Sequence, residues 1–474
     1  MSAFLGAKVR LKLALPKGRL QRATSNFLRR AGLDFSDYEQ GNRLYRLKSQ
    51  VCPDLFAKVF HEKDIAVQVA IGNYDLGICG LDWVEELLVK YPSEAVIKLR
   101  GLGYGKRRLF VASSSFSNQQ SLEDLNKRVG PVRLVSEYPN LAEAFSLRLR
   151  LANFRVFPVW GAAEAYPPEQ AELALVSASS AEELLELNLV PLREILDGEA
   201  FLLANRESLE KKNLGRLLSA LYRVALKSED QESPPPSPPV GCPPDQEGLI
   251  YLALPDGHQQ VPTSRFLERA GLELQGYSAS SFVRRPTAKL PGLAIKVVRP
   301  QDMPLQVANR NFSLAITGKD WLLDHLARFP SSPVEEVAEL GFGRVRLVAV
   351  VSQELKVESV RELRALLQSG KLEFLRIASE YVNLADRYAR ENHLAPYKVI
   401  PTWGATEAFL PEDADLLIEN TQTGKTLAKH GLKIIDTLFE SSACLIGHRE
   451  ELRREEVGRV AEILCRGTRD ADNL

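Results

Sequence analysis

The stretch from Glu419 to Leu427 reads Glu-Asn-Thr-Gln-Thr-Gly-Lys-Thr-Leu, and it indicates the kind of fold to expect. The apolar run Asp415–Ile418 before it predicts a buried strand. After it, a short helix is expected to end at Gly431. A strand, a turn and a helix N-terminus can cradle a phosphate, because Gly424 lets the backbone approach the anion closely. An ordinary helix cap explains the same pattern about as well. The candidate phosphate-binding residues are Glu419, Thr421, Thr423, Gly424, Lys425, Thr426 and Leu427.

The composition is typical of a globular protein with more than one domain. A chain of 474 residues is too long for one core of usual size. Lys plus Arg and Asp plus Glu both number 61, so the formal net charge is zero, which argues against a nucleic-acid-binding protein. The five cysteines form no Cys-x-x-Cys pair and the six histidines no ligand spacing, so reduced thiols and no structural zinc are expected. No signal peptide or membrane-spanning run is recognisable, so a cytoplasmic location is expected.

The chain contains an internal duplication, and this determines the expected architecture. Leu-Ala-Leu-Pro at 13–16 recurs at 252–255, and Ser-Glu-Tyr-x-Asn-Leu-Ala at 136–142 recurs at 379–385. Further pairs are the Gly-Ile-Cys-Gly-Leu-Asp-Trp segment at 77–83 with 315–321, and Trp-Gly-Ala-x-Glu-Ala at 160–165 with 403–408. Repeats at a nearly constant offset are typical of a tandem of homologous units. We therefore expect half 1 at 1–227, a Pro-rich linker at 228–248 without chemistry of its own, and half 2 at 249–474.

Strand-like and helix-like segments alternate in each half. Val9–Leu15 and Leu76–Cys79 have strand patterns, whereas Gln21–Ala31 has helical periodicity. This alternation predicts α/β halves built on parallel sheets, each half with two lobes and a cleft. Ligand-binding loops should then lie at the carboxyl ends of the strands.

Charged residues follow several of these predicted strands. Lys17, Gly18 and Arg19 come directly after the first strand, where two cations suit a polyphosphate, although a solvated turn is an equal alternative. In half 2, Arg299 could point into the cleft, while Asp302 is expected to cap the helix after it. The glutamates of the repeated motifs could cap helices, bind sugar hydroxyls or position a magnesium ion. They are Glu137, Glu164, Glu380 and Glu407.

Read together, these motifs resemble ATP phosphoribosyltransferase. The resemblance covers nearly all of both halves and excludes the linker. The matching segments are Leu-Ala-Leu-Pro-Lys-Gly-Arg-Leu at 13–20, Asp-Leu-Gly-Ile-x-Gly-x-Asp at 75–82, Arg-Pro-x-Asp-x-Pro at 299–304, Gly-Phe-Gly at 341–343 and Thr-Gly-Lys-Thr-Leu at 423–427, with the two glutamate motifs of each half.

The resemblance implies a fold and a reaction. The fold would be two tandem periplasmic-binding-protein-like (type II) halves, each with two lobes and a central cleft. The reaction would transfer the phosphoribosyl group of phosphoribosyl pyrophosphate to N1 of ATP, with Mg²⁺, and release pyrophosphate. This is the first step of histidine biosynthesis. Each half is similar to one catalytic subunit of the short form, which usually depends on a regulatory subunit similar to histidyl-tRNA synthetase. Self-association is also expected.

The two halves depart from the family pattern in different places. Half 2 keeps the phosphate loop and Arg299, but reads Asp256-Gly257-His258 in place of Lys-Gly-Arg. Half 1 keeps Lys-Gly-Arg, but its loop reads Ser-Ser-Ala-Glu-Glu at 179–183, and His61 replaces the arginine. Glu182 and Glu183 are expected to face the position of a phosphate and to repel it.

The resemblance implies that, in dimers of ATP phosphoribosyltransferases, an arginine of one subunit extends into the site of its partner. Arg43 in half 1 matches that arginine, whereas half 2 has Ser281. The resemblance thus implies Arg43 and Arg299 as catalytic residues and a principal site in the half-2 cleft. A catalytically weak regulatory or ligand-binding homologue is the alternative. A solute-binding protein is disfavoured by the missing signal peptide.

Overall fold

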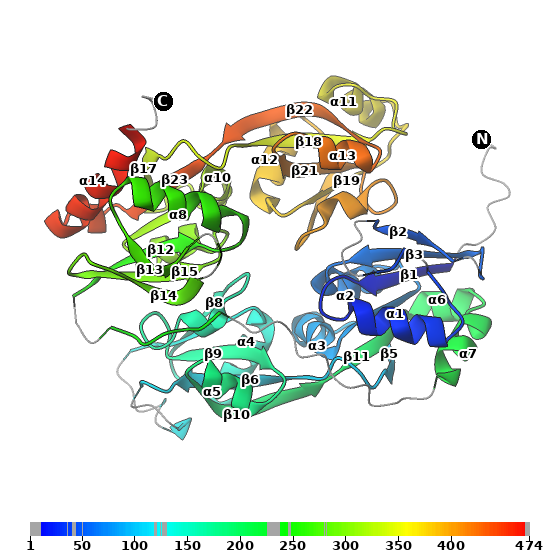
Figure 1. Ribbon diagram of the computed structural model, residues 1–474. Helices are drawn as coiled ribbons and strands as arrows, with labels where there is room; N and C mark the ends of the chain where they lie inside the picture. The colour runs from blue at the N-terminus through cyan, green and yellow to red at the C-terminus, as the bar shows by residue number, and fades with distance from the viewer. Residues whose placement is uncertain are drawn as a thin grey trace.

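The computed structural model describes residues 11–469 except for 36, 40–43, 50, 118–120, 124, 126–129, 225–237, 245–247, 279 and 281. Within these residues the chain forms four lobes, two in each half (Figure 1). No helix among them is long and apolar enough to cross a membrane.

Half 1 contains lobes 1A and 1B, and lobe 1A is built from the start and the end of the half. Its elements are β1 (Leu11–Pro16), β2 (Arg46–Lys48), β3 (Leu55–Phe60), β4 (Leu76–Gly80), β5 (Val96–Gly101), β11 (Ala200–Asn205), α1 (Gln21–Arg30), α2 (Glu62–Ala70), α3 (Leu81–Lys90), α6 (Arg206–Lys211) and α7 (Gly215–Arg223). The sheet order is β2-β3-β1-β4-β11-β5. Successive residues of β1 enter different cores, Leu13 and Leu15 on one face and Ala14 on the other, so helices cover both faces.

Lobe 1B is the middle of half 1. Its elements are β6 (Arg107–Ser114), β7 (Val132–Ser136), β8 (Phe154–Pro158), β9 (Leu173–Ala178), β10 (Leu189–Gly198), α4 (Pro139–Arg148), η2 (Ala163–Ala165) and α5 (Ala181–Glu186). Its sheet order is β10-β6-β9-β7-β8. The chain therefore crosses between the lobes twice, from β5 to β6 and from β10 to β11.

Half 2 repeats this plan in lobes 2A and 2B. Lobe 2A holds β12 (Ile250–Pro255), β13 (Leu274–Tyr277), β14 (Phe282–Ala288), β15 (Leu293–Val298), β16 (Leu314–Gly318), β17 (Val334–Glu339), β23 (Ala443–His448), η3 (Gly257–Gln259), α8 (Gln260–Arg269), α9 (Met303–Ala308), α10 (Lys319–Arg328), η5 (Glu451–Arg453) and α14 (Glu455–Arg469). Lobe 2B holds β18 (Val345–Ser352), β19 (Leu375–Ser379), β20 (Tyr397–Pro401), β21 (Leu416–Thr421), β22 (Leu432–Ser441), α11 (Val360–Gln368), α12 (Val382–Glu391), η4 (Thr406–Phe409) and α13 (Lys425–Lys429).

These sheets confirm the α/β fold of two tandem periplasmic-binding-protein-like (type II) halves. The prediction of purely parallel sheets is wrong, however. β11 returns from lobe 1B and inserts antiparallel between β4 and β5, and β23 does the same between β16 and β17. The predicted strands and helices otherwise agree closely: the helix expected at Gln21–Ala31 is α1, and the strand expected at Leu76–Cys79 is β4.

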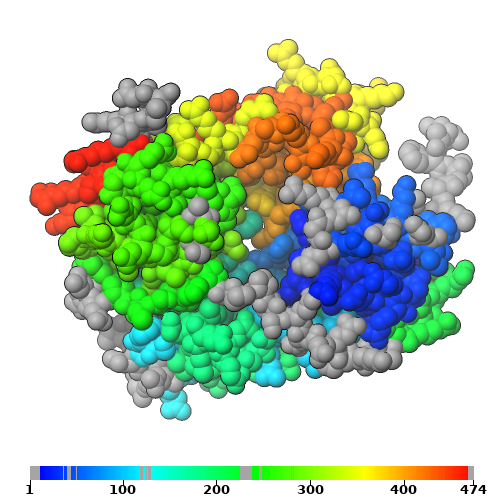
Figure 2. All heavy atoms as spheres, in the orientation of Figure 1, coloured from blue at the N-terminus to red at the C-terminus, as the bar shows by residue number. Residues whose placement is uncertain are grey.

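The halves dock antiparallel and reciprocally, which confirms a pseudo-two-fold arrangement. Lobe 2B (yellow to orange) packs on lobe 1A (blue), and lobe 2A (mostly green) packs on lobe 1B (teal) (Figures 1 and 2). Hydrophobic clusters cross both contacts. Phe60 of β3 stacks edge-on against Phe409 of lobe 2B, and Tyr166 of lobe 1B contacts Phe312 of lobe 2A in the same way.

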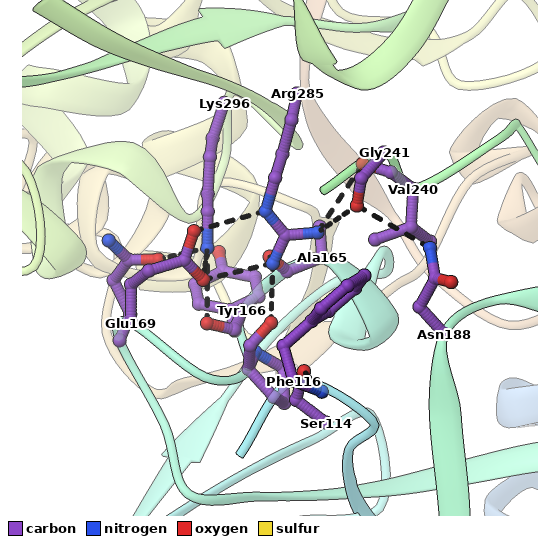
Figure 3. A network of polar contacts seen from close by, with 12 residues as sticks. Ser114, Phe116, Ala165, Tyr166, Glu169, Asn188, Val240, Gly241, Arg285 and Lys296 are labelled. Carbon is purple, nitrogen blue, oxygen red and sulfur yellow. Dashed lines mark hydrogen bonds and ion pairs between the residues drawn. The ribbon is translucent and has the colours of Figure 1, made fainter. Parts of the chain in front are cut away.

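A buried lysine lies at the centre of each contact. Lys58 on β3 pairs with Glu412 at 2.9 Å and with Asp413 at 2.7 Å. Its equivalent on β15, Lys296, pairs with Glu169 at 2.8 Å and also donates to the Gln170 side chain (Figure 3). The two contacts therefore differ in charge, because Asp413 in one is Gln170 in the other.

The linker takes part in the second contact. The backbone N–H of Arg284 donates to the Pro239 carbonyl at 2.7 Å, and the Arg285 guanidinium donates to the carbonyls of Val240 and Gly241 (Figure 3). Val240 is 2% exposed. Residues 239–241 of the predicted linker therefore pack against β14, a contact that this proline-rich segment does not signal in the sequence.

The two lysines should respond differently to removal. Lys58→Met leaves the buried Asp413 carboxylate without a cation, while Glu412 keeps its ion pair with Arg46, and should lower the free energy of unfolding by about 3–5 kcal/mol. Lys296→Met leaves Glu169 paired with Arg285 and should change it by less than about 1.5 kcal/mol. Chemical denaturation of both variants measures this, and equal losses would contradict the charge difference between the contacts.

The Lys296 variant also makes a pH prediction. Burial, with the nearby Arg285 charge, lowers the pKa of Lys296 to about 7 in the folded protein. The unfolded chain keeps that proton to about pH 10, so wild-type stability gains from rising pH between 7 and 10. The stability of wild type relative to Lys296→Met should therefore be lowest below pH 7 and increase toward pH 10.

Candidate functional site

The predicted phosphate loop lies in lobe 2B between β21 and α13. Gly424 has a φ of +73°, a left-handed conformation that favours glycine. Its N–H donates to the Thr421 hydroxyl at 2.9 Å, and the Lys425 N–H donates to the Thr423 hydroxyl at 3.5 Å. The turn is thus held by its own threonines. Thr423, Lys425 and Thr426 are exposed, whereas Leu427 is buried in the core shared with lobe 1A and anchors the turn.

Three carboxylates cluster beside this loop. Glu419 lies on β21, Glu380 follows β19, and Glu407 lies in η4. Burial, together with the Glu407 charge, raises the pKa of Glu380 to about 7. Burial and the charges of Glu380 and Glu407 raise the pKa of Glu419 well above its usual value. The three side chains therefore share one uncompensated negative region, which favours a bound cation.

The equivalent carboxylates of half 1 are neutralised within the protein. Glu137, the counterpart of Glu380, pairs with Lys63 at 3.1 Å. Glu164, the counterpart of Glu407, pairs with Arg284 at 3.1 Å. The third position holds Val176 in place of Glu419. The cluster of carboxylates without a paired lysine or arginine is therefore, among the described residues, a feature of half 2.

The cluster is not a ready-made metal cage. Within the described parts of the chain, no group of three or more His, Cys, Asp or Glu side chains is arranged to hold a metal ion. A divalent cation would consequently need oxygen ligands from a substrate in addition to these carboxylates, as Mg²⁺ commonly does with phosphates.

In half 1, the loop at 179–183 holds a carboxylate of its own, that of Glu183. Glu183 accepts hydrogen bonds from the Ser179 N–H at 2.7 Å and from the Ser179 hydroxyl, and it pairs with Arg107 at 3.2 Å. Partial burial alone would raise the pKa of Glu183, but these Ser179 and Arg107 contacts lower it. Glu182 points to solvent, so the expectation that both carboxylates face the phosphate position is wrong for Glu182. Ser180 is the N-cap residue of α5, and Glu183 follows it by three residues. Residues three apart lie on the same side of a helix, so Glu183 points inward and Glu182 does not.

A cavity of about 540 Å³ lies in the half-1 cleft. It is lined by both lobes of half 1, by Arg284 and Arg299 of half 2, and by Pro238 of the linker. Its five cations are each paired with a carboxylate. The pairs are Arg19–Glu62, Lys63–Glu137, Arg107–Glu183, Arg284–Glu164 and Arg299–Asp256. Burial lowers the pKa of His61 to about 4, so this side chain adds no charge at neutral pH.

The predicted residues therefore divide into two groups. Arg19 and Arg299 line the half-1 cavity, where Arg299 lies against Gly161. Glu380, Glu407 and the loop from 419 to 427 meet in lobe 2B. Lys17 contacts the second group through Tyr45. Gly18, at a φ of +86°, forms the turn between Lys17 and Arg19.

Asp302 has a different role from the one expected. It makes no side-chain cap on α9, and its carboxylate accepts the Trp160 N–H of lobe 1B at 2.9 and 3.1 Å. Asp64 in half 1 likewise accepts the Trp403 N–H of lobe 2B. Asp302 is therefore an anchor between the halves, because its αR backbone points the carboxylate away from the first helical turn.

Sequence reasoning missed Tyr45 and Arg107. Tyr45 links Lys17 to Glu407 across the halves, and Arg107 neutralises Glu183. Neither lies in a repeated motif, so only the fold reveals them. Arg43 and Ser281 lie outside the described residues.

Two segments of the chain are similar to one family of known activity. A family model described as ATP phosphoribosyltransferase matches residues 61–223 and again 299–466. The ATP phosphoribosyltransferase of Saccharolobus solfataricus is 34% identical over 218 residues, which are 45% of this chain and 70% of the relative. That of Prosthecochloris aestuarii is 32% identical over 225 residues, 46% of this chain and 70% of the relative.

Solved structures are similar to about half of the chain. An ATP phosphoribosyl transferase complex from Thermotoga maritima matches 47% of this chain and 100% of the solved chain, with 21% identity and a TM-score of 0.38. The alkanesulfonate-binding protein SsuA from Xanthomonas axonopodis matches 46% of this chain and 73% of its own, with 13% identity and a TM-score of 0.31.

The two matched segments of the family model fall in equivalent parts of the two halves, and each curated relative covers about half of the chain. Members of this family are metal-requiring transferases. The chain therefore belongs to the ATP phosphoribosyltransferase family, the glycosyltransferases of histidine biosynthesis, and carries two copies of its fold in tandem.

Proposed function

We propose that this protein transfers the phosphoribosyl group of phosphoribosyl pyrophosphate to N1 of ATP in the cytoplasm, releasing pyrophosphate at a single site in half 2. One observation carries the assignment to half 2: the Gly424 loop lies beside three carboxylates that share an uncompensated charge. In half 1, by contrast, the corresponding groups are paired internally.

The reaction needs orientation and charge stabilisation more than base catalysis, since the adenine nitrogen already has a free lone pair. The exposed Thr423 and Thr426 hydroxyls and the Lys425 ammonium would hold phosphate oxygens. Glu380 and Glu407 would hold ribose hydroxyls or a cation. Arg43, if it reaches this site from half 1, would stabilise charge on the departing pyrophosphate.

The proposed metal is Mg²⁺, which would neutralise charge on the pyrophosphate when bound. Its fit rests on the crowding of Glu380, Glu407 and Glu419: burial and the neighbouring carboxylate charges raise the pKa of Glu380 and of Glu419, and a bound cation would relieve that repulsion. Carboxylate and phosphate oxygens are ligands that Mg²⁺ prefers.

A regulatory subunit similar to histidyl-tRNA synthetase is part of this proposal. Its support is the resemblance of each half to the short form of the enzyme. Steady-state pyrophosphate release from ATP and phosphoribosyl pyrophosphate, with and without such a subunit, tests both activity and dependence. Activity that is full without the subunit would remove it from the proposal.

Gly424→Glu should weaken phosphoribosyl pyrophosphate binding by about 100-fold or more, because a carboxylate would occupy the place of the phosphate. Gly424→Ala is the matched control. It carries the same positive-φ strain, and a Cβ there meets only Ile434 at 3.6 Å, so it adds neither charge nor a clash. Titration calorimetry that gave equal affinities for both variants would contradict an anion at this loop.

Arg43→Ala should lower turnover by roughly 10- to 1000-fold, the range for losing one oriented charge donor, with little change in melting temperature. The motivation is that half 1 keeps this arginine while half 2 keeps the loop that would receive it. Glu183→Ala in half 1 should leave turnover nearly unchanged. Full activity in Arg43→Ala with altered activity in Glu183→Ala would place the working site in half 1.

Glu380 should give the pH–rate profile an acid limb near pH 7, where its carboxylate becomes protonated as the pH falls. Glu380→Gln should lower the plateau rate and flatten that limb. The measurement is kcat from about pH 5.5 to 9 in the wild type and in Glu380→Gln. If the acid limb persists unchanged in the variant, the limb belongs to another group.

A further inference from the structure

A side chain of half 1 reaches the carboxylate cluster of half 2. The Tyr45 hydroxyl donates a hydrogen bond to Glu407 Oε1 at 3.0 Å and accepts one from Lys17 Nζ at 3.3 Å. The ammonium also lies 5.2 Å from the centre of the Tyr45 ring. Lys17, Tyr45 and Glu407 thus form a chain of contacts from the first strand of half 1 into the half-2 site.

Tyr45 is held firmly in this position. Its side chain is buried, with 6% of its surface exposed, and it belongs to the lobe 1A core. On the other side its ring contacts His430, with centroids 5.3 Å apart. His430 directly follows α13, the helix of the phosphate loop. The tyrosine therefore touches both components of the proposed site, the carboxylate cluster and the loop helix.

The equivalent series of side-chain contacts, between lobes 2A and 1B, has different charges. In half 2, Asp256 stands in place of Lys17 and Arg284 in place of Tyr45. Arg284 donates to Asp256 at 2.9 Å and to Glu164 of half 1 at 3.1 Å. That arrangement is a closed ion-pair network, since one buried cation lies between two carboxylates.

The difference decides what each glutamate can still bind. Glu164 is neutralised by a fixed guanidinium, so it has little left to attract a cation. Among the described residues, no lysine or arginine forms an ion pair with Glu407. A neutral hydroxyl orients this carboxylate while leaving its charge available, and Lys17 polarises the hydroxyl from behind.

We propose that Tyr45, supported by Lys17, is a positioning residue that half 1 contributes to the half-2 site by orienting Glu407. The inference rests on the proposed function and adds a contact across the halves to it. It also gives Lys17 a role at the half-2 site, whereas its neighbour Arg19 faces the half-1 cavity. The Asp256 and Arg284 pair, by the same logic, keeps the half-1 cleft from recruiting a cation.

Tyr45→Phe tests the proposal, because it removes one hydroxyl and keeps the buried ring. The KM for phosphoribosyl pyrophosphate should rise, and kcat/KM for it fall, by about 10- to 150-fold, the range for one hydrogen bond to a charged group. The KM for ATP should change by less than about two-fold, and the melting temperature by less than about 2 °C. Equal losses for both substrates, or an unchanged kcat/KM, would overturn the assignment.

Lys17 variants separate charge from packing. Lys17→Met should reproduce most of the Tyr45→Phe defect, and Lys17→Arg should restore activity. Glu164→Gln, the counterpart in the half-1 cleft, is the matched control and should leave both KM values unchanged. If Lys17→Met behaves as wild type, the relay from Lys17 is wrong.

A transplant gives an independent result. The double variant Lys17→Asp, Tyr45→Arg copies the Asp256 and Arg284 pair to the contact with Glu407. Titration calorimetry should then detect no binding of phosphoribosyl pyrophosphate, while circular dichroism shows that the fold persists. Retained binding would overturn the inference. An inactive wild type would instead refute the proposed function, and calorimetry would still report whether Tyr45 affects binding.

Discussion

Reciprocal docking of the lobes is the constraint on which the rest of this structure depends. Each half is an open two-lobed body, and each lobe completes its core against a lobe of the other half. Buried Lys58 and Lys296 fix the register of the two contacts, because a buried charge must meet its partners or remain unpaired. The duplication thus converts a dimer interface into an intramolecular one, with no loss of affinity on dilution.

An intramolecular pair allows the two clefts to diverge. In a symmetric dimer any substitution appears at both sites, whereas here each half can change alone. Half 2 has retained the left-handed Gly424 turn and the clustered carboxylates. Half 1 contributes the Tyr45 hydroxyl, which donates a hydrogen bond to Glu407 in the carboxylate cluster of half 2. The linker takes part as well, because its Pro238 lines the half-1 cavity.

The sequence predicted the repeated architecture, most elements and the strand–turn–helix loop, because these depend on local pattern and on internal repetition. It could not predict the antiparallel returns of β11 and β23, since strand direction within a sheet is a tertiary property. It also misassigned Asp302, where cap preference and an interface contact compete for one carboxylate. Arg107 and Tyr45 escaped notice for a related reason: their partners are far away in sequence and adjacent only after folding.

The charge pattern of the half-1 cleft suggests why the substitutions occur together. A site built for a polyanion holds cations whose desolvation the ligand offsets, and without the ligand these cations would be left unpaired. Each cation that lines the half-1 cavity is paired with a carboxylate of the protein, and one of these carboxylates is Glu183 at the position of the phosphate loop. With these cations already paired, a polyphosphate would have to displace a carboxylate in order to bind there. In half 2, burial and the Glu407 charge raise the pKa of Glu380 to about 7, and the loop has exposed hydrogen-bond donors. Under the proposed function, a substrate phosphate and a cation would complete the charge of this site.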